Sequence, residues 1–174
     1  MNEVQTMEGF DIRHLFTASL SYKSDLEPVV PPGGRDGTLI GNGDGELEGQ
    51  DLSGKVRWSM YSGNCAYVFV QAGVEPTPGQ HLCTVSPGGV IETHDGAQVW
   101  FDAKGFGLRG FDESQPNVWV LTMSIQFKTT DERYGWLNST LGTVTSEFDD
   151  SVGKAIWRTY IPITDKEDSG LTTS

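Results

Sequence analysis

The fold is decided by the stretch from Val90 to Phe101, which reads VIETHDGAQVWF. Asp-Gly between two β-rich arms is a strong signal for a two-residue hairpin turn, because both turn positions need positive φ angles. Centring the turn on Asp95-Gly96 pairs Val90 with Phe101 across the hairpin. Six side chains then share one face of the predicted sheet: Val90, Glu92, His94, Ala97, Val99 and Phe101.

Alternating runs on both sides of this hairpin predict further strands. Residues 119–127 form the longest, and within 55–61 the side chains of Val56, Trp58 and Met60 fall on one face. The other predicted strands cover residues 14–20, 38–40, 45–48, 66–71, 134–144 and 155–163, with a long loop or broken edge at 73–88. About eight to ten short strands with tight turns predict an all-β protein, a single antiparallel β-barrel with at most a short helix.

The length of 174 residues indicates one domain with a proper core. We expect a flexible N-terminus over residues 1–10, a barrel domain over 11–163 and a disordered tail over 164–174. The tail carries too few apolar side chains to pack.

Composition excludes several classes of partner. The net charge of −12 repels phosphate backbones and anionic lipid heads, so we expect neither nucleic acid nor membrane as a partner. The N-terminus has no basic start followed by an apolar stretch, which argues against a secretory signal. Two cysteines, Cys65 and Cys83, are too few for a disulfide framework. We therefore expect both thiols to be reduced and the protein to be cytoplasmic.

Motifs for cofactors are missing from the sequence. It has no P-loop and no Gly-x-Gly-x-x-Gly after a strand. Residues 42–46 resemble a calcium loop, but Leu47 stands where such a loop needs glycine. The three histidines, His14, His81 and His94, lack the spacing of metal ligands. We predict no cofactor and no metal.

Four stretches together resemble one known family. They are PGGR at 32–35, GELEG followed by LSGKV at 45–56, THDGA at 93–97 and ERYGWLN at 132–138, with a closing WRTY at 157–160. The combination resembles the family catalogued as domain-of-unknown-function 3237, over roughly residues 12–163. Where that family commonly has two acids before the hairpin glycine, this chain has His94-Asp95. The resemblance implies a small β-barrel and, for fungal-type members, cofactor-free ring closure of the chalcone isomerase kind with a histidine as the base.

Such a ring closure needs a base that removes a phenol proton and donors that hold the resulting enolate. Neutral imidazole suits the first step, because its ordinary pKa lies near neutral pH. His94 shares the predicted hairpin face with apolar residues, and His14 shares strand parity with Phe16 and Leu20. Glu92 could orient an imidazole. The plainer interpretation is a half-exposed, inert histidine at a strand end and a surface glutamate.

Candidate substrate-binding residues lie in two further strands. Tyr134, Trp136 and Asn138 alternate on one face of the predicted strand 134–144, where they could stack on an aromatic ring, or form a structural hairpin. Trp58 could line the pocket, although core packing is its commoner role, and Arg133 could meet a phenolate or simply pair with an acid.

We therefore expect an enzyme, a cofactor-independent isomerase or cyclase that acts on an aromatic or polyketide-derived molecule in the barrel lumen. The alternative is a non-catalytic small-molecule-binding or structural barrel. The expected partner is a small apolar or phenolic ligand, and a homodimer is left open.

Overall fold

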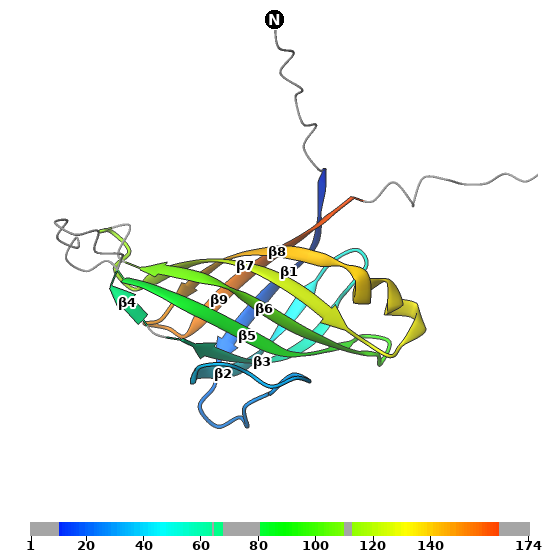
Figure 1. Ribbon diagram of the computed structural model, residues 1–174, viewed down its shortest axis with the longest axis horizontal. Coiled ribbons are helices and arrows are strands. Elements are labelled where there is room, and N and C mark those ends of the chain that lie inside the picture. The colour runs from blue at the N-terminus through cyan, green and yellow to red at the C-terminus, as the bar shows by residue number, and fades with distance from the viewer. Residues whose placement is uncertain (1–10, 64, 68–80, 110–112, 164–174) are drawn as a thin grey trace, which may run out of the picture.

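The computed structural model describes residues 11–63, 65–67, 81–109 and 113–163 (Figure 1). The predicted termini, 1–10 and 164–174, lie outside these residues. The strands are β1 (Ile12–Tyr22), β2 (Thr38–Glu48), β3 (Gly54–Ser62), β4 (Cys65–Tyr67), β5 (His81–Thr93), β6 (Gln98–Arg109), β7 (Val118–Lys128), β8 (Leu141–Asp149) and β9 (Lys154–Pro162). A short 3-10 helix, η1 (Glu132–Ser139), lies between β7 and β8.

The strands form one closed antiparallel barrel, as predicted. Each long strand pairs with the next along the chain, β9 pairs back with β1, and β3 pairs with β5, which closes the sheet. The three-residue β4 pairs with the start of β5 beyond the end of β3. Closure leaves no long strand edge unpaired in the described sheet, which removes a common site of aggregation. In the described part of the chain, no helix is both long and apolar enough to cross a membrane.

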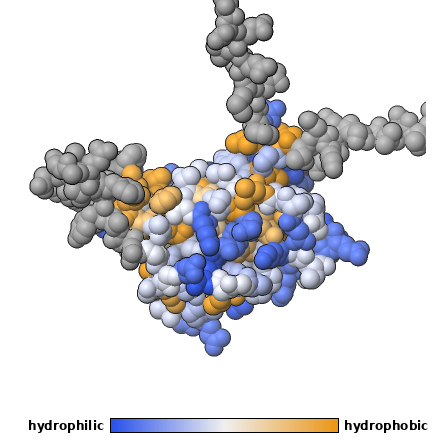
Figure 2. All heavy atoms as spheres, in the orientation of Figure 1, coloured by the Kyte–Doolittle hydropathy of each residue, from blue (hydrophilic) through white to orange (hydrophobic). Residues whose placement is uncertain are grey.

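The core is the interior of the barrel. Along β7 the side chains of Leu121, Met123, Ile125 and Phe127 are each at most 2% exposed, while the residues between them face outward. The same alternation buries Val56, Trp58 and Met60 of β3, which confirms the face predicted for that strand. Figure 2 shows that much of the visible outer face is hydrophilic, with apolar residues at separate places on it. Period-two patterning therefore determines which residues face the core.

Two segments differ from their predicted form. Residues 38–48 are one continuous strand with a register shift between Leu39 and Gly41, where two separate strands, 38–40 and 45–48, were predicted. Residues 81–88 belong to β5, although they were predicted to lie in the long loop or broken edge at 73–88, because of its prolines and glycines. The strand tolerates Gly89 because the backbone of Arg57 lies where a β-carbon would be, so only glycine fits this pairing. Of the predicted strand 66–71, residues 68–71 lie outside the described part.

The β5–β6 hairpin differs from the prediction by one residue. Glu92 pairs with Gln98 and Ile91 with Val99, so the loop holds three residues, 94–96. The amide of Gly96 donates to the carbonyl of Thr93 at 2.9 Å, and Gly96 has a φ of 87°. This is the three-residue loop in which a glycine in the left-handed region follows a type I turn. The one-residue difference exchanges the two faces of β5.

Residues 132–139 are helical, where a strand was predicted from 134. The carboxylate of Asp131 caps the helix by accepting from the amide of Arg133 at 3.0 Å. A 3-10 helix has three residues per turn, so Tyr134, Trp136 and Asn138 do not share one face as they would on a strand. Leu137 is the buried residue of the helix. The predicted single short helix is confirmed, but its place was not predicted.

Candidate functional site

The barrel interior is filled by side chains. A gap inside it measures about 10 Å³ and is bordered by apolar residues that include Phe101, Ile125 and Trp157. About one water-sized sphere occupies that volume, so the lumen of this structure does not admit an aromatic ligand. Trp58 is 4% exposed and belongs to this core, which matches its plainer interpretation. The prediction of a ligand in the lumen is not compatible with this packing.

His14 lies on the outside of the barrel. Phe16, Ala18 and Leu20 point inward as predicted, but a register shift between His14 and Phe16 reverses the facing of His14. Its Nε2 lies 2.9 Å from the hydroxyl of Thr17. The imidazole meets the ring of Tyr160 edge-on, with 5.6 Å between the ring centres. A β-bulge inserts one extra residue into a strand, so the alternation of inward and outward side chains changes at that point. His14 was predicted to face inward on the assumption that the alternation was unbroken.

His94 and Glu92 are also exposed. His94 lies in the three-residue loop, and Glu92 faces outward because the hairpin register is shifted by one residue. The inward positions belong instead to Ile91 and Thr93. Neither residue lies on an apolar face, contrary to the prediction. His14 lies on β1, which pairs with β2 and β9, whereas His94 lies in the loop between β5 and β6.

Two of the family-like motifs meet at one end of the barrel. The carboxylate of Asp95, from THDGA, accepts from the guanidinium of Arg133 at 2.7 Å and from the hydroxyl of Tyr134 at 3.1 Å, both from ERYGWLN. It also accepts from the hydroxyl of Thr93 at 2.5 Å. Arg133 continues to the carboxylate of Asp131 at 2.7 Å. We call these five residues the end clamp, because they fasten η1 to the β5–β6 loop.

The guanidinium of Arg133 lies between the two carboxylates of the end clamp, Asp95 and Asp131. The hydrogen bond from Thr93 contributes most to holding the pKa of Asp95 below its ordinary value, and the hydrogen bond from Tyr134 and the positive charge of Arg133 add to it against partial desolvation. The hydrogen bond from Arg133 likewise lowers the pKa of Asp131. Desolvation and the neighbouring Asp95 raise the pKa of Tyr134. A carboxylate with three donors and a lowered pKa is a poor proton acceptor, so the clamp is a structural device rather than a general base.

The remaining motif residues also have structural contacts. Asn138 bonds both backbone groups of Thr129, its carbonyl accepting at 2.8 Å and its amide donating at 3.0 Å. Trp136 is 37% exposed, and the guanidinium of Arg13 lies 5.8 Å from its ring centre. These contacts hold the loop between β7 and β8 against the barrel, which favours the structural interpretation of this string over a stacking platform.

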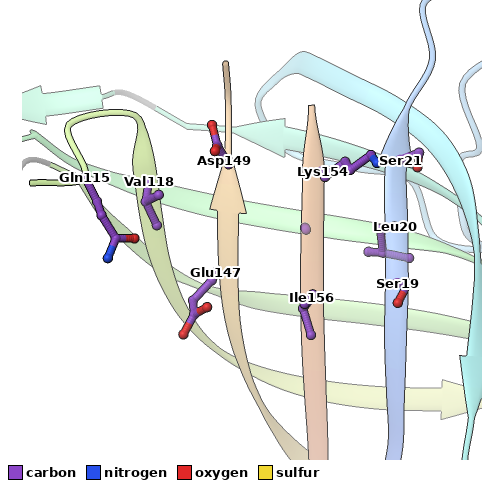
Figure 3. Close-up of a pocket in the computed structure, with 10 residues that line it drawn as sticks. Ser19, Leu20, Ser21, Gln115, Val118, Glu147, Asp149, Lys154 and Ile156 are labelled. Atoms are coloured by element: carbon purple, nitrogen blue, oxygen red, sulfur yellow. The ribbon is translucent and has the colours of Figure 1, made fainter. Parts of the chain in front are cut away.

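The described surface has a groove of about 430 Å³ on the outside of β1, β9, β8 and β7. Figure 3 shows its side chains, with Lys154 projecting to the β1 side of β9 and Glu147 to the β7 side of β8. Strand pairing fixes their order, since Ile156 lies opposite Glu147 and Lys154 lies opposite Asp149. Ile156 is 41% exposed. The lining residues are Ser19, Leu20, Ser21, Gln115, Val118, Glu147, Asp149, Lys154, Ala155 and Ile156.

This groove offers an apolar middle between charged groups. Ile156 and Val118 supply apolar surface, Glu147 and Asp149 supply carboxylates, and Lys154 supplies an ammonium group. Asp149 accepts from the hydroxyl of Ser151 at 2.6 Å, and this bond lowers its pKa. Among the described residues, no group of three or more histidine, cysteine, aspartate or glutamate side chains could hold a metal ion.

Sequence reasoning did not single out any groove residue. Their four strands lie far apart in the sequence, from Ser19 on β1 to Ile156 on β9, and each contributes only one or two outward positions. The available signal was period-two alternation, which marks Glu147 and Ile156 as outward-facing but does not show that they are neighbours.

Comparisons with solved structures support the same fold. A conserved protein of unknown function from Rhodopseudomonas palustris has a TM-score of 0.61 at 18% identity, over 90% of this chain and 99% of that one. A beta-barrel-like protein from Acinetobacter baumannii has a TM-score of 0.59 at 17% identity, over 91% of this chain and 100% of that one. A protein of unknown function from Clostridium acetobutylicum has a TM-score of 0.58 at 14% identity, over 91% and 100%. At this identity the likeness concerns the fold alone. The sequence matches no family model and no curated protein.

Proposed function

We propose that the protein binds a small phenolic or polyketide-derived molecule in the outer groove. The observation that carries this proposal is the lining of the groove, which combines the exposed side chain of Ile156 with Lys154 and Glu147. Its volume of about 430 Å³ falls within the range of small-molecule sites, roughly 300–1,000 Å³, whereas the interior gap measures about 10 Å³. A second surface groove of about 430 Å³, which Glu92 lines, is bordered by the charged residues Lys55 and Arg57.

The lining suggests how such a ligand lies. An aromatic ring covers the exposed faces of Ile156 and Val118, which removes apolar surface from water. A phenolate or carbonyl oxygen then meets the ammonium group of Lys154, and a phenolic hydroxyl donates to Glu147. Asp149 lies opposite Lys154 on β8, so a polar group of the ligand meets a pair of opposite charges that is already in place.

For the reaction, we propose ring closure of the chalcone isomerase kind, which rests on the sequence resemblance to the domain-of-unknown-function 3237 family. Glu147 takes the place of the predicted histidine base. Its carboxylate accepts the phenol proton, the phenolate oxygen bonds to the β-carbon of the enone, and the carbon–carbon double bond becomes an enolate. The proton then returns to the α-carbon. A carboxylate is a weak base toward a phenol, so attraction between Lys154 and the developing anion has to assist.

The binding step is tested by titrating the full-length protein with 2′-hydroxychalcone and following backbone amide shifts by NMR. We expect shifts on the outer faces of β1, β7, β8 and β9. Ile156→Gln should weaken binding at least several-fold, because it removes apolar contact at the centre of the groove. The matched control is Leu141→Gln, which changes a residue that is 62% exposed and lies outside the groove. Shifts confined to other faces, or equal effects of both variants, would overturn the assignment.

The catalytic step is tested by the rate of flavanone formation above the spontaneous background. Glu147→Gln should lower kcat by about 10²–10⁴, the usual contribution of a general base. His14→Ala and His94→Ala should keep the wild-type rate, since both side chains lie outside the groove. A protein that binds in the groove without exceeding the background supports the non-catalytic binding barrel, and a rate that depends on either histidine refutes the role of Glu147.

A further inference from the structure

Three polar side chains inside the barrel have no hydrogen-bond partner among the described residues. They are Ser146 of β8 and Trp157 and Thr159 of β9, whose hydroxyl oxygens and indole nitrogen are buried. The three residues are at most 2% exposed. More than nine in ten buried polar groups in proteins have a partner, so three exceptions on two neighbouring strands require a physical account.

The strand register places these three residues next to one another. Ser146 lies directly opposite Trp157, and Thr159 lies opposite Val144, one inward position further along β9. Directly opposed β-carbons are about 4.5–5.5 Å apart, and diagonal ones somewhat further. Trp157 also meets Phe101 edge-on at 5.9 Å between ring centres, which fixes one side of its indole. The three residues therefore lie next to one another on the interior face of β8 and β9.

Their chemistry is complementary to one water molecule. The indole N–H is a donor only, while the serine and threonine hydroxyls can accept. A water oxygen can accept from the indole and donate its two hydrogens to the two hydroxyls, which gives the three hydrogen bonds typical of a buried water. Trp157 also borders the apolar interior gap of about 10 Å³, which neither Ser146 nor Thr159 lines.

We propose that the barrel holds one long-lived water molecule between Ser146, Trp157 and Thr159. This water is part of the folded structure and joins polar side chains of β8 and β9 inside the barrel. The site is separate from the outer groove, because none of the three residues lines it, and it stands or falls independently of the proposed ligand.

The direct test is a ¹⁵N-edited NOESY and ROESY experiment on the wild-type protein. A water held for longer than the tumbling time should give the indole proton of Trp157 a cross-peak to water of opposite sign in the two spectra. Absence of that cross-peak, with the indole resonance assigned by its loss in Trp157→Phe, would overturn the proposal.

The second test is the change in melting temperature caused by Thr159→Val, because its sign depends on whether Thr159 bonds a water. If Thr159 bonds the water, Thr159→Val leaves the water short of a partner and should lower the melting temperature by about 3–6 °C. If its hydroxyl has no partner at all, the same substitution removes a buried polar group and should raise it. Thr145→Val is the control, since Thr145 faces outward from β8 and its change should move the melting temperature by less than about 1–2 °C. A rise for Thr159→Val refutes the water site.

Discussion

Leu137 should anchor the 3-10 helix that closes one end of the barrel. Its side chain is 0% exposed, it is the buried residue of η1, and it belongs to the main core cluster. Replacing a fully buried leucine by alanine costs about 3 kcal/mol, from lost transfer free energy and the cavity left behind. For a chain of this length each kcal/mol corresponds to about 2–4 °C, so Leu137→Ala should lower the melting temperature by about 6–12 °C.

The assay is urea unfolding followed by tryptophan fluorescence, with thermal unfolding by circular dichroism beside it. The control is the same substitution at Leu141, which is 62% exposed and should change the free energy of unfolding by no more than about 0.5 kcal/mol. Ligand binding in the outer groove should be unchanged per folded molecule. The structural interpretation of the ERYGWLN string is wrong if Leu137→Ala costs less than about 1 kcal/mol, or if it abolishes ligand binding while stability is kept.

Two further predictions concern acid stability and the cysteines. Asp95, Asp131 and Asp149 have pKa values lowered by hydrogen bonds in the folded protein, so their stabilising effect is present above the ordinary carboxylate pKa of about 4 and is lost as pH falls through the folded values. The melting temperature should therefore decrease as the pH is lowered below about 4, and it should decrease less steeply in Asp149→Asn. The same dependence of melting temperature on pH in that variant and in the wild type would contradict the stabilising role of Asp149. Cys65 lies opposite Cys83 in the strand register, within the backbone separation that a disulfide needs, yet we expect both to be reduced and therefore alkylated once the protein is unfolded in denaturant without reductant, because Cys83 is buried in the native protein. An intact bridge by mass spectrometry would refute the prediction of reduced thiols.

The end clamp shows why motif residues can be found in a sequence and still be misread. The strings THDGA and ERYGWLN were both singled out, but nothing in the sequence shows that Asp95 lies 2.7 Å from Arg133. That contact joins residues 38 positions apart. It forms only when the β5–β6 loop and the N-terminus of η1 are both folded. Arg133 and Tyr134, which were candidate substrate-binding residues, therefore hold η1 against the β5–β6 loop.

The sequence by itself determined the class of fold and most of the core. Alternation with period two is a local property, and it placed Met123, Ile125 and Phe127 on the inner face because burying one face of a strand requires it. The Asp-Gly turn was also local, and it located the hairpin.

Only the tertiary structure decided the facing of the candidate catalytic residues and the position of the groove. A bulge before Phe16 turned His14 outward, and a third loop residue turned Glu92 outward. Each is a shift of one residue, which needs only a small local change in the backbone but exchanges the two faces of a strand. The groove joins Glu147 and Lys154 with residues of β1 and β7 through the closure of the barrel. That closure depends on pairing between the first and last strands, and no local pattern records it.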